Sequence, residues 1–181
     1  LGKASDLLSY LKKEADYSDS HFRMWDFQIH ESHVQYWDHS PYLLNGLHVG
    51  SIKNIAANDR LHICNQQNSI SPSQHKSKPQ HVMYDDELLM KKVSDLFRNA
   101  FAKDLMFDFR GGSTLPIHVG QLPNTEGVVD RVGNEYISRV RENPLLDKQG
   151  DGIKSYAGIL FETVASERDI TLIDEPEAFL H

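Results

Sequence analysis

The last stretch of the chain places acidic residues directly after an apolar run. The run covers 170–173 (ITLI), two adjacent acids, Asp174 and Glu175, follow it, and a third acid, Glu177, comes after a proline. An apolar run bounded by charge is typical of a buried parallel strand, and ligands bind at the carboxyl ends of such strands. Neighbouring strand residues point to opposite faces, so we expect the two carboxylates to do different work. One can hold Mg²⁺ on phosphates, and the other can orient and deprotonate an attacking water.

A glycine-rich turn lies upstream of this run. Residues 148–161 read KQGDGIKSYAGILF, a turn that enters an apolar helix. Asp151 is the predicted N-cap, the first-turn amides of such a helix favour an anion, and Lys154 adds a positive charge nearby. A helix, a turn and a strand that ends in two acids therefore form one linked arrangement.

The two segments together resemble the signature motif and the Walker B motif of ABC-type ATPase heads. The branch that they resemble holds the structural-maintenance-of-chromosomes proteins, DNA-repair recombination ATPases and overcoming-lysogenisation-defect (OLD-like) AAA-family ATPases, many of which serve in phage defence. The resemblance implies a P-loop NTPase of the α/β class with a mixed sheet, of which this chain is expected to be a part. Its expected regions are an N-terminal lobe (1–81), a helix and hairpin region (82–147), and the signature helix with the Walker B strand (148–181).

The resemblance also implies roles for single residues. Asp174 would bind Mg²⁺, Glu175 would be the general base, and Glu177 and His181 would lie in a loop that meets the partner subunit. The signature, which in the family binds the γ-phosphate of a nucleotide held by the other protomer, would comprise Gly150, Asp151, Gly152, Lys154 and Ser155. The family usually has Ser at the first of these positions and often Gly at the second. This chain therefore lacks a hydroxyl contact and carries an acid that must turn away to cap the helix.

The Walker A motif is the part of the family pattern that this chain does not contain in full. A P-loop needs GxxxxGK[ST], and the chain opens with LGKAS, in which Gly2, Lys3 and Ser5 could be the tail of that motif. The alternative is that Ser5 is a plain N-cap. Gln66 or Gln67 is a candidate for the glutamine that reports on bound nucleotide. In the family a strand and a switch histidine follow Walker B, so we expect the rest of the head to be missing from this chain.

The remaining patterns predict the elements that position these motifs. Helical spacing and Gly, Pro and Asn signals predict three helices, three strands, one hairpin and one mobile loop. These are helices at 5–13, 85–100 and 135–144, strands at 22–29, 47–52 and 60–64, a hairpin at 104–120 around Arg110-Gly111-Gly112, and the polar loop 65–81.

Composition narrows the class of protein. The chain has 181 residues, a net charge of −7 and a single cysteine, Cys64, which indicates a reducing compartment. No apolar run approaches the roughly 18 residues of a membrane span and no signal peptide opens the chain, so the expected location is cytoplasmic, without a membrane partner. The charge disfavours a dedicated nucleic-acid binder, although a local basic patch would allow DNA as a partner. His30, His33 and His39 do not make a closed zinc site, and we expect ordinary histidines there.

The predicted function is that of an ATPase which binds and hydrolyses ATP with Mg²⁺. It would act as a homo-oligomer of head-to-tail ATPase dimers. It would control an effector such as a nuclease or toxin in a DNA-linked or antiviral system, and the effector rests on the resemblance alone. One alternative is a nucleotide-gated scaffold with little turnover. Another is a metal-dependent nuclease that uses Asp174, Glu175 and Glu177 directly.

Overall fold

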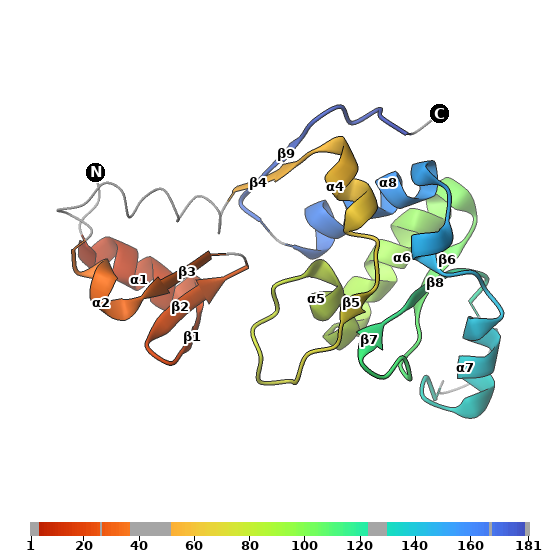
Figure 1. The fold of residues 1–181 in the computed structure, drawn as a ribbon, viewed down its shortest axis with the longest axis horizontal. Coiled ribbons are helices and arrows are strands. Elements are labelled where there is room, and N and C mark those ends of the chain that lie inside the picture. The colour runs from red at the N-terminus through yellow and green to blue at the C-terminus, as the bar shows by residue number, and fades with distance from the viewer. Residues whose placement is uncertain (1–3, 26, 37–51, 123–129, 167, 180–181) are drawn as a thin grey trace.

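Helices and short strands alternate in the computed structural model, which describes residues 4–25, 27–36, 52–122, 130–166 and 168–179 (Figure 1). This confirms the predicted α/β class. The strands form one three-stranded sheet and three two-stranded sheets among the described residues. The predicted mixed sheet is therefore wrong for this part of the chain, because its parallel and antiparallel pairs lie in separate small sheets.

The described helices are α1 (Ala4–Glu14), α2 (Glu31–Val34), α4 (Ala57–His62), α5 (Pro79–Asp85), α6 (Glu87–Phe101), α7 (Asn134–Arg141) and α8 (Asp151–Leu160), with a 3-10 turn η3 (Leu146–Lys148) and a π-helical turn η4 (Phe161–Ala165). The described strands are β1 (Asp16–Ser18), β2 (His21–Met24), β3 (Phe27–His30), β4 (Ile52–Ile55), β5 (Gln67–Asn68), β6 (Asp104–Phe107), β7 (Thr114–Leu115), β8 (Ile117–Gly120) and β9 (Ile170–Ile173).

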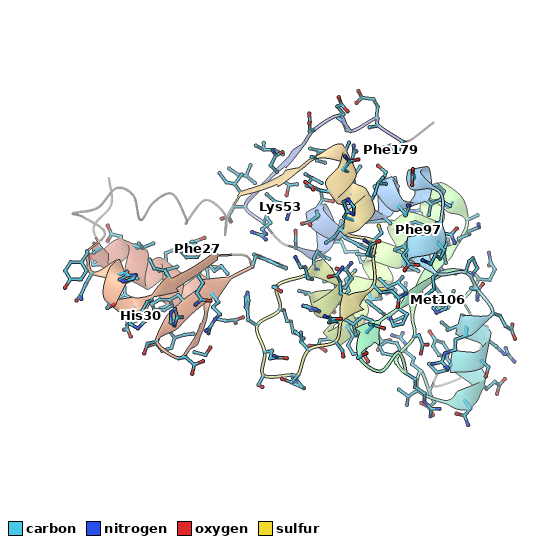
Figure 2. All side chains as sticks on the ribbon, in the orientation of Figure 1. Phe27, His30, Lys53, Phe97, Met106 and Phe179 are labelled. Carbon is cyan, nitrogen blue, oxygen red and sulfur yellow. The ribbon has the colours of Figure 1, made fainter. Side chains whose placement is uncertain are left out.

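The larger hydrophobic core lies around α6, and Phe97 is at its centre (Figure 2). Helix α6 begins at Asp86, whose carboxylate accepts a hydrogen bond from the Leu89 amide at 2.9 Å, and Ala102 ends it in the left-handed conformation. Its apolar face packs on β6, which pairs antiparallel with β8. The helix predicted at 85–100 and the hairpin predicted at 104–120 are thus confirmed, as is a helix within 135–144 (α7).

A second, smaller core joins α1 to the three-stranded sheet β1–β2–β3. Leu11 of α1 and Phe22 of β2 are fully buried there. The helix predicted at 5–13 is confirmed, but Ser5 lies inside it and is not its N-cap. The single strand predicted at 22–29 is wrong: Trp25 has φ +52° in the turn that folds the segment into the β2–β3 hairpin.

The strand predicted at 60–64 is also wrong, because residues 60–62 belong to α4 and residues 63–64 form the turn after it. The Asp59 carboxylate accepts a hydrogen bond from the Ala56 amide at 3.1 Å and so satisfies a free donor at the start of the helix. The next segment, predicted as a loop at 65–81, contains the short strand β5, which pairs with β7, and the first turn of α5. Pro79 at the first position of α5 suits a helix start.

The two strands β4 and β9 form the parallel sheet, with Ile52 opposite Ile170 and Ile55 opposite Ile173. The parallel strand predicted at 170–173 is confirmed. The prediction that both of its faces are covered is wrong for the described residues, since Ile170 is 49% and Leu172 54% exposed. Of the strand predicted at 47–52, residues 47–51 lie outside the described part of the chain.

Candidate functional site

Asp174 and Glu175 lie at the carboxyl end of β9, where the sequence predicted chemistry. The Asp174 amide donates to the Ile55 carbonyl of β4 at 3.1 Å, which extends the parallel pairing by one residue. The chain then turns sharply, and Glu175 has φ +45°, a left-handed conformation that is uncommon for a residue with a side chain. Asp174, Glu175 and Glu177 are all exposed. The backbone is thus fixed to the sheet while the acids face solvent.

One buried arginine binds the backbone of this turn. Arg60 of α4 is fully buried, and its Nη2 donates to the carbonyl oxygens of Glu175 at 2.8 Å and Asp174 at 3.3 Å. Its Nη1 donates to the carbonyl of Pro176 at 3.2 Å. One guanidinium therefore binds three successive carbonyls of the turn that carries both candidate acids.

Helix α8 begins at the glycine-rich turn, as the sequence predicted, but with a different cap. Gly150 is the N-cap and Asp151 is the first helical residue, so the prediction of Asp151 as N-cap is wrong. The Asp151 carboxylate instead forms an ion pair with Lys154 at 2.8 Å, across one turn of the helix. The Lys154 side chain is only 18% exposed. This pair partly neutralises the charge that Lys154 would offer to an anion at this helix end.

The first two turns of α8 contact the segment that follows β9. The Ser155 hydroxyl donates to the Ala178 carbonyl at 3.2 Å, and a Cβ at Gly152 would lie 2.7 Å from the Phe179 carbonyl oxygen. Figure 2 shows Phe179 beside these helices, near the end of the described chain. Seven of the predicted residues (Asp151, Gly152, Lys154, Ser155, Asp174, Glu175 and Glu177) therefore lie on α8 or the adjoining 174–179 segment.

Three residues that the sequence reading did not select build this arrangement: Arg60, Cys64 and Gly158. A Cβ at Gly158 would lie 2.3 Å from the Arg60 carbonyl oxygen, so α4 and α8 cross where only glycine fits. The Cys64 thiol contacts the carbonyls of Lys154 at 3.1 Å and Arg60 at 3.4 Å. Burial raises the pKa of Cys64 to about 12, which keeps the thiol protonated and able to donate.

The remaining candidates lie elsewhere or outside the described residues. Ser5 is in α1, which Figure 1 shows well away from the segment after β9. Gln66 donates to the Asp147 carboxylate at 3.1 Å, and Gln67 donates to the Asn65 carbonyl at 2.8 Å. Gly2, Lys3, His39 and His181 lie outside the described part of the chain.

Potential metal ligands are dispersed in the described segments. No group of three or more His, Cys, Asp or Glu residues there is arranged to hold a metal ion, so the three acids Asp174, Glu175 and Glu177 do not form such a cluster. The rings of His30 and His33 lie 5.8 Å apart, and His30 Nδ1 is engaged by the Ser32 hydroxyl at 2.7 Å.

Comparisons with known proteins add no relative. No protein-family model matches the chain, and neither a curated protein nor a solved structure matches it. In the parts of the chain that the structure describes, no helix combines the length and the apolar character needed to cross a membrane.

Proposed function

We propose that this chain is part of an ABC-type ATPase that binds and hydrolyses Mg-ATP at Asp174 and Glu175. One observation carries the proposal: both acids are exposed on a backbone that is hydrogen-bonded to Arg60 and β4, at the carboxyl end of a parallel strand. Fixed positions matter because a catalytic carboxylate acts only within hydrogen-bonding reach of its water. The carboxyl end of a parallel strand is also where ligands bind in α/β proteins.

The two acids take different roles in this proposal. Asp174 holds Mg²⁺, and Glu175 orients a water and accepts its proton. Two exposed carboxylates suit Mg²⁺, because this ion is usually bound by one or two carboxylates together with substrate phosphates. When bound, Mg²⁺ would neutralise charge on the phosphates.

Helix α8 supplies the second half of the proposal. Its amino-terminal turn, from Gly150 to Ser155, presents backbone amides that favour an anion, and it adjoins the 174–179 segment through Ser155. The turn would bind a nucleotide phosphate held by a second copy of the chain, so that two copies would close on two nucleotides. Control of a nuclease or toxin, and a link to DNA or antiviral defence, belong to the same proposal through the resemblance alone.

A nucleotide-gated scaffold is the second candidate, and the ion pair between Asp151 and Lys154 favours it. Lys154 is held by an acid on its own helix and offers less charge to a phosphate. A weakened phosphate site would permit binding and assembly with little turnover. The two functions therefore differ in turnover rather than in ATP binding.

Mg-ATP turnover of the native protein, compared with Glu175→Gln, tests the proposal. We expect turnover to fall by roughly 10²- to 10⁴-fold while ATP binding is retained, because the amide cannot accept the proton of the water. Glu177→Gln is the matched control, since it changes a nearby exposed acid. Equal and negligible turnover in the wild type and Glu175→Gln, with ATP bound, would favour the scaffold. No ATP binding by the wild type would overturn both functions.

A further inference from the structure

Arg60 is unusual because it is a buried cation without an acid beside it. Its side chain is fully buried, and no described Asp or Glu carboxylate forms an ion pair with it. Its Nε is also buried and has no hydrogen-bond partner among the described residues. Burying a charge is costly unless it is paired, and an unsatisfied buried donor adds to that cost. The compensation that the structure offers is the set of three carbonyls in the turn after β9.

Those three hydrogen bonds act on a backbone that needs support. The left-handed conformation of Glu175, with φ +45°, is one that side chains disfavour. Strained backbone persists where its surroundings fix it, and such residues gather at functional sites. Arg60 binds the carbonyl of Glu175 and those of its two neighbours, Asp174 and Pro176, so it fixes the peptide planes on both sides of Glu175.

The position of Arg60 is itself set by α8. Contact at Gly158 brings the backbone of α4 close to α8, and the Cys64 thiol links the carbonyls of Arg60 and Lys154. Helix α8 also contacts the far end of the same segment through Ser155 and Ala178. The 174–179 segment is therefore bound by α4 at its first three residues and by α8 near its end.

We infer that Arg60 is a positioning residue for the acids Asp174 and Glu175: its buried guanidinium fixes the backbone from which both carboxylates project. This inference rests on the proposed function, in which these acids act on Mg-ATP. Arg60 itself does not touch the nucleotide. It acts through three carbonyls, and a guanidinium fork is the side chain that can bind several of them at once.

Arg60→Lys is the test, because lysine keeps the positive charge but loses the planar fork. In Mg-ATP turnover we expect kcat to fall by roughly 10- to 100-fold, since small misplacements of reacting groups cost about that much, while KM stays within about threefold. In hydrogen exchange followed by mass spectrometry, the 174–179 segment should exchange at least about tenfold faster, with α6 unchanged. Arg141→Lys is the matched control: Arg141, the last residue of α7, also binds a backbone carbonyl, that of Arg110 at 3.2 Å, and it pairs with the Asp108 carboxylate at 2.6 Å. It should leave kcat and exchange at 174–179 unchanged.

The outcomes separate this inference from the proposed function. Unchanged kcat and unchanged exchange in Arg60→Lys, beside an active wild type, would overturn the role of Arg60 alone. Exchange that rises equally in all segments, with kcat per folded molecule unchanged, would also overturn it, because the role would then be stability only. A wild type that neither binds nor hydrolyses ATP would overturn the proposed function and this inference with it.

A measurement on the wild type covers the case in which Arg60→Lys does not fold. Nuclear magnetic resonance of the arginine side chains should show the Arg60 Nη protons exchanging slowly with solvent, because they are buried and bound to carbonyls. Arg139, which is exposed on α7, provides the fast-exchanging reference. Arg60 Nη protons that exchange as fast as those of Arg139 would overturn the inference.

Discussion

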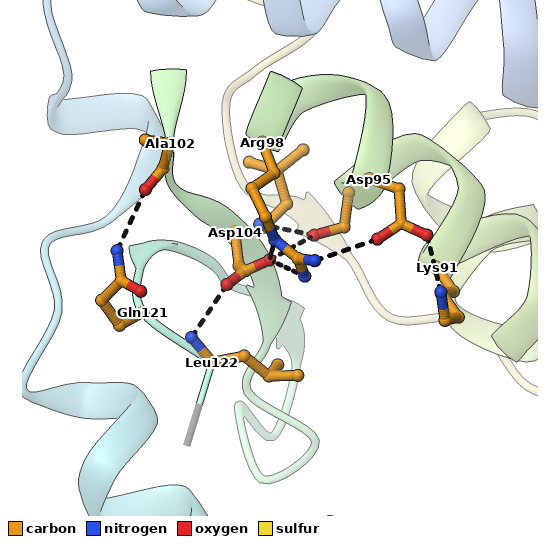
Figure 3. Close-up of polar contacts among 9 residues, drawn as sticks. Lys91, Asp95, Arg98, Ala102, Asp104, Gln121 and Leu122 are labelled. Atoms are coloured by element: carbon orange, nitrogen blue, oxygen red, sulfur yellow. Dashed lines mark hydrogen bonds and ion pairs between the residues drawn. The ribbon is translucent and has the colours of Figure 1, made fainter. Parts of the chain in front are cut away.

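Acidic residues lie at one end of a strand in two regions of this protein, at the start of β6 and after β9. The acid is buried in the first region, and the acids are exposed in the second. At the start of β6, Asp104 is buried and its carboxylate accepts hydrogen bonds from Arg98 Nε at 2.6 Å and from the Leu122 amide at 3.0 Å (Figure 3). At the end of β9, Asp174 and Glu175 are exposed, and the buried group is the cation Arg60, which binds only their backbone.

The difference separates a structural carboxylate from one that is free to react. Asp104 uses its oxygens to bind α6 and residue 122 to the hairpin, so nothing remains for a ligand. Asp108 at the other end of β6 does the same, since its carboxylate accepts hydrogen bonds from Arg141 Nε at 2.6 Å and the Arg110 amide at 2.8 Å. At the end of β9 the backbone carbonyls make the structural contacts instead. We expect substitutions of the acids after β9 to lower activity and substitutions of the acids at the ends of β6 to lower stability.

Among the substitutions that test this difference, Asp174→Asn should have the largest effect on activity. We expect Mg-ATP turnover to fall by at least about 10²-fold, because Mg²⁺ contributes several kcal/mol of charge stabilisation and the amide binds it poorly. The melting temperature should stay within a degree or so of the wild type, as for an ordinary surface substitution. Turnover against Mg²⁺ concentration and a thermal melt would measure both. A large loss of stability would show that Asp174 is structural, as Asp104 is, and would contradict the difference between the two regions.

Asp104→Asn should give the reverse result. We expect the free energy of unfolding to fall by about 2–3 kcal/mol, because hydrogen bonds to a charged acceptor are lost in a buried place. Turnover per folded molecule should be unchanged. Urea denaturation and steady-state kinetics would measure the two quantities. Turnover that falls with Asp104→Asn, in protein shown to be folded, would contradict the division between the regions.

Gly158→Ala tests the support beneath the turn after β9. The added Cβ would meet the Arg60 carbonyl oxygen at 2.3 Å and push α4 away from α8. We expect the free energy of unfolding to fall by about 1–2 kcal/mol, as overpacked positions do. Gly150→Ala is the control, because a Cβ there has no heavy atom within 4 Å. Equal melting temperatures for the two variants would show that this helix contact is not close.

The smallest effect should come from Asp95→Asn, which removes a partly exposed acid near Asp104. The hydrogen bond from Lys91 holds the pKa of Asp95 below its ordinary 3.8, with smaller help from the charges of Lys91 and Arg98. A depressed pKa means that the pair stabilises the folded state above pH 3.8 and that this contribution is lost as the pH falls through the folded-state pKa. Thermal melts at pH 7 and below pH 3 should show a small gap between the wild type and Asp95→Asn that closes in acid. A loss of stability as large as that of Asp104→Asn would contradict the expected difference between buried and partly exposed acids.

The sequence predicted elements well where a local pattern is enough to specify them. Helix α6 follows from apolar spacing and the acids of its first turn, and the β6–β8 hairpin follows from two apolar runs around Arg110-Gly111-Gly112. The prediction of a strand at 60–64, where residues alternate, is wrong because α4 covers residues 60–62. The Asp59 carboxylate accepts a hydrogen bond from the amide of Ala56, the N-cap of that helix. Helix α4 packs its buried side against α8. An alternating pattern over only five residues cannot distinguish a strand from a short helix.

Strand β9 and the helix after Gly150 could be predicted from the sequence, because each depends on residues that are neighbours along the chain. The roles of Asp174 and Glu175 are still a proposal. The contact of Arg60 with the turn and the fit of Gly158 against α4 arise only from the tertiary structure. Arg60 and Glu175 are 115 positions apart in the chain, and no local pattern marks their contact. A buried arginine bound to carbonyls has no sequence signature, because every residue presents a carbonyl and only folding selects which three it meets.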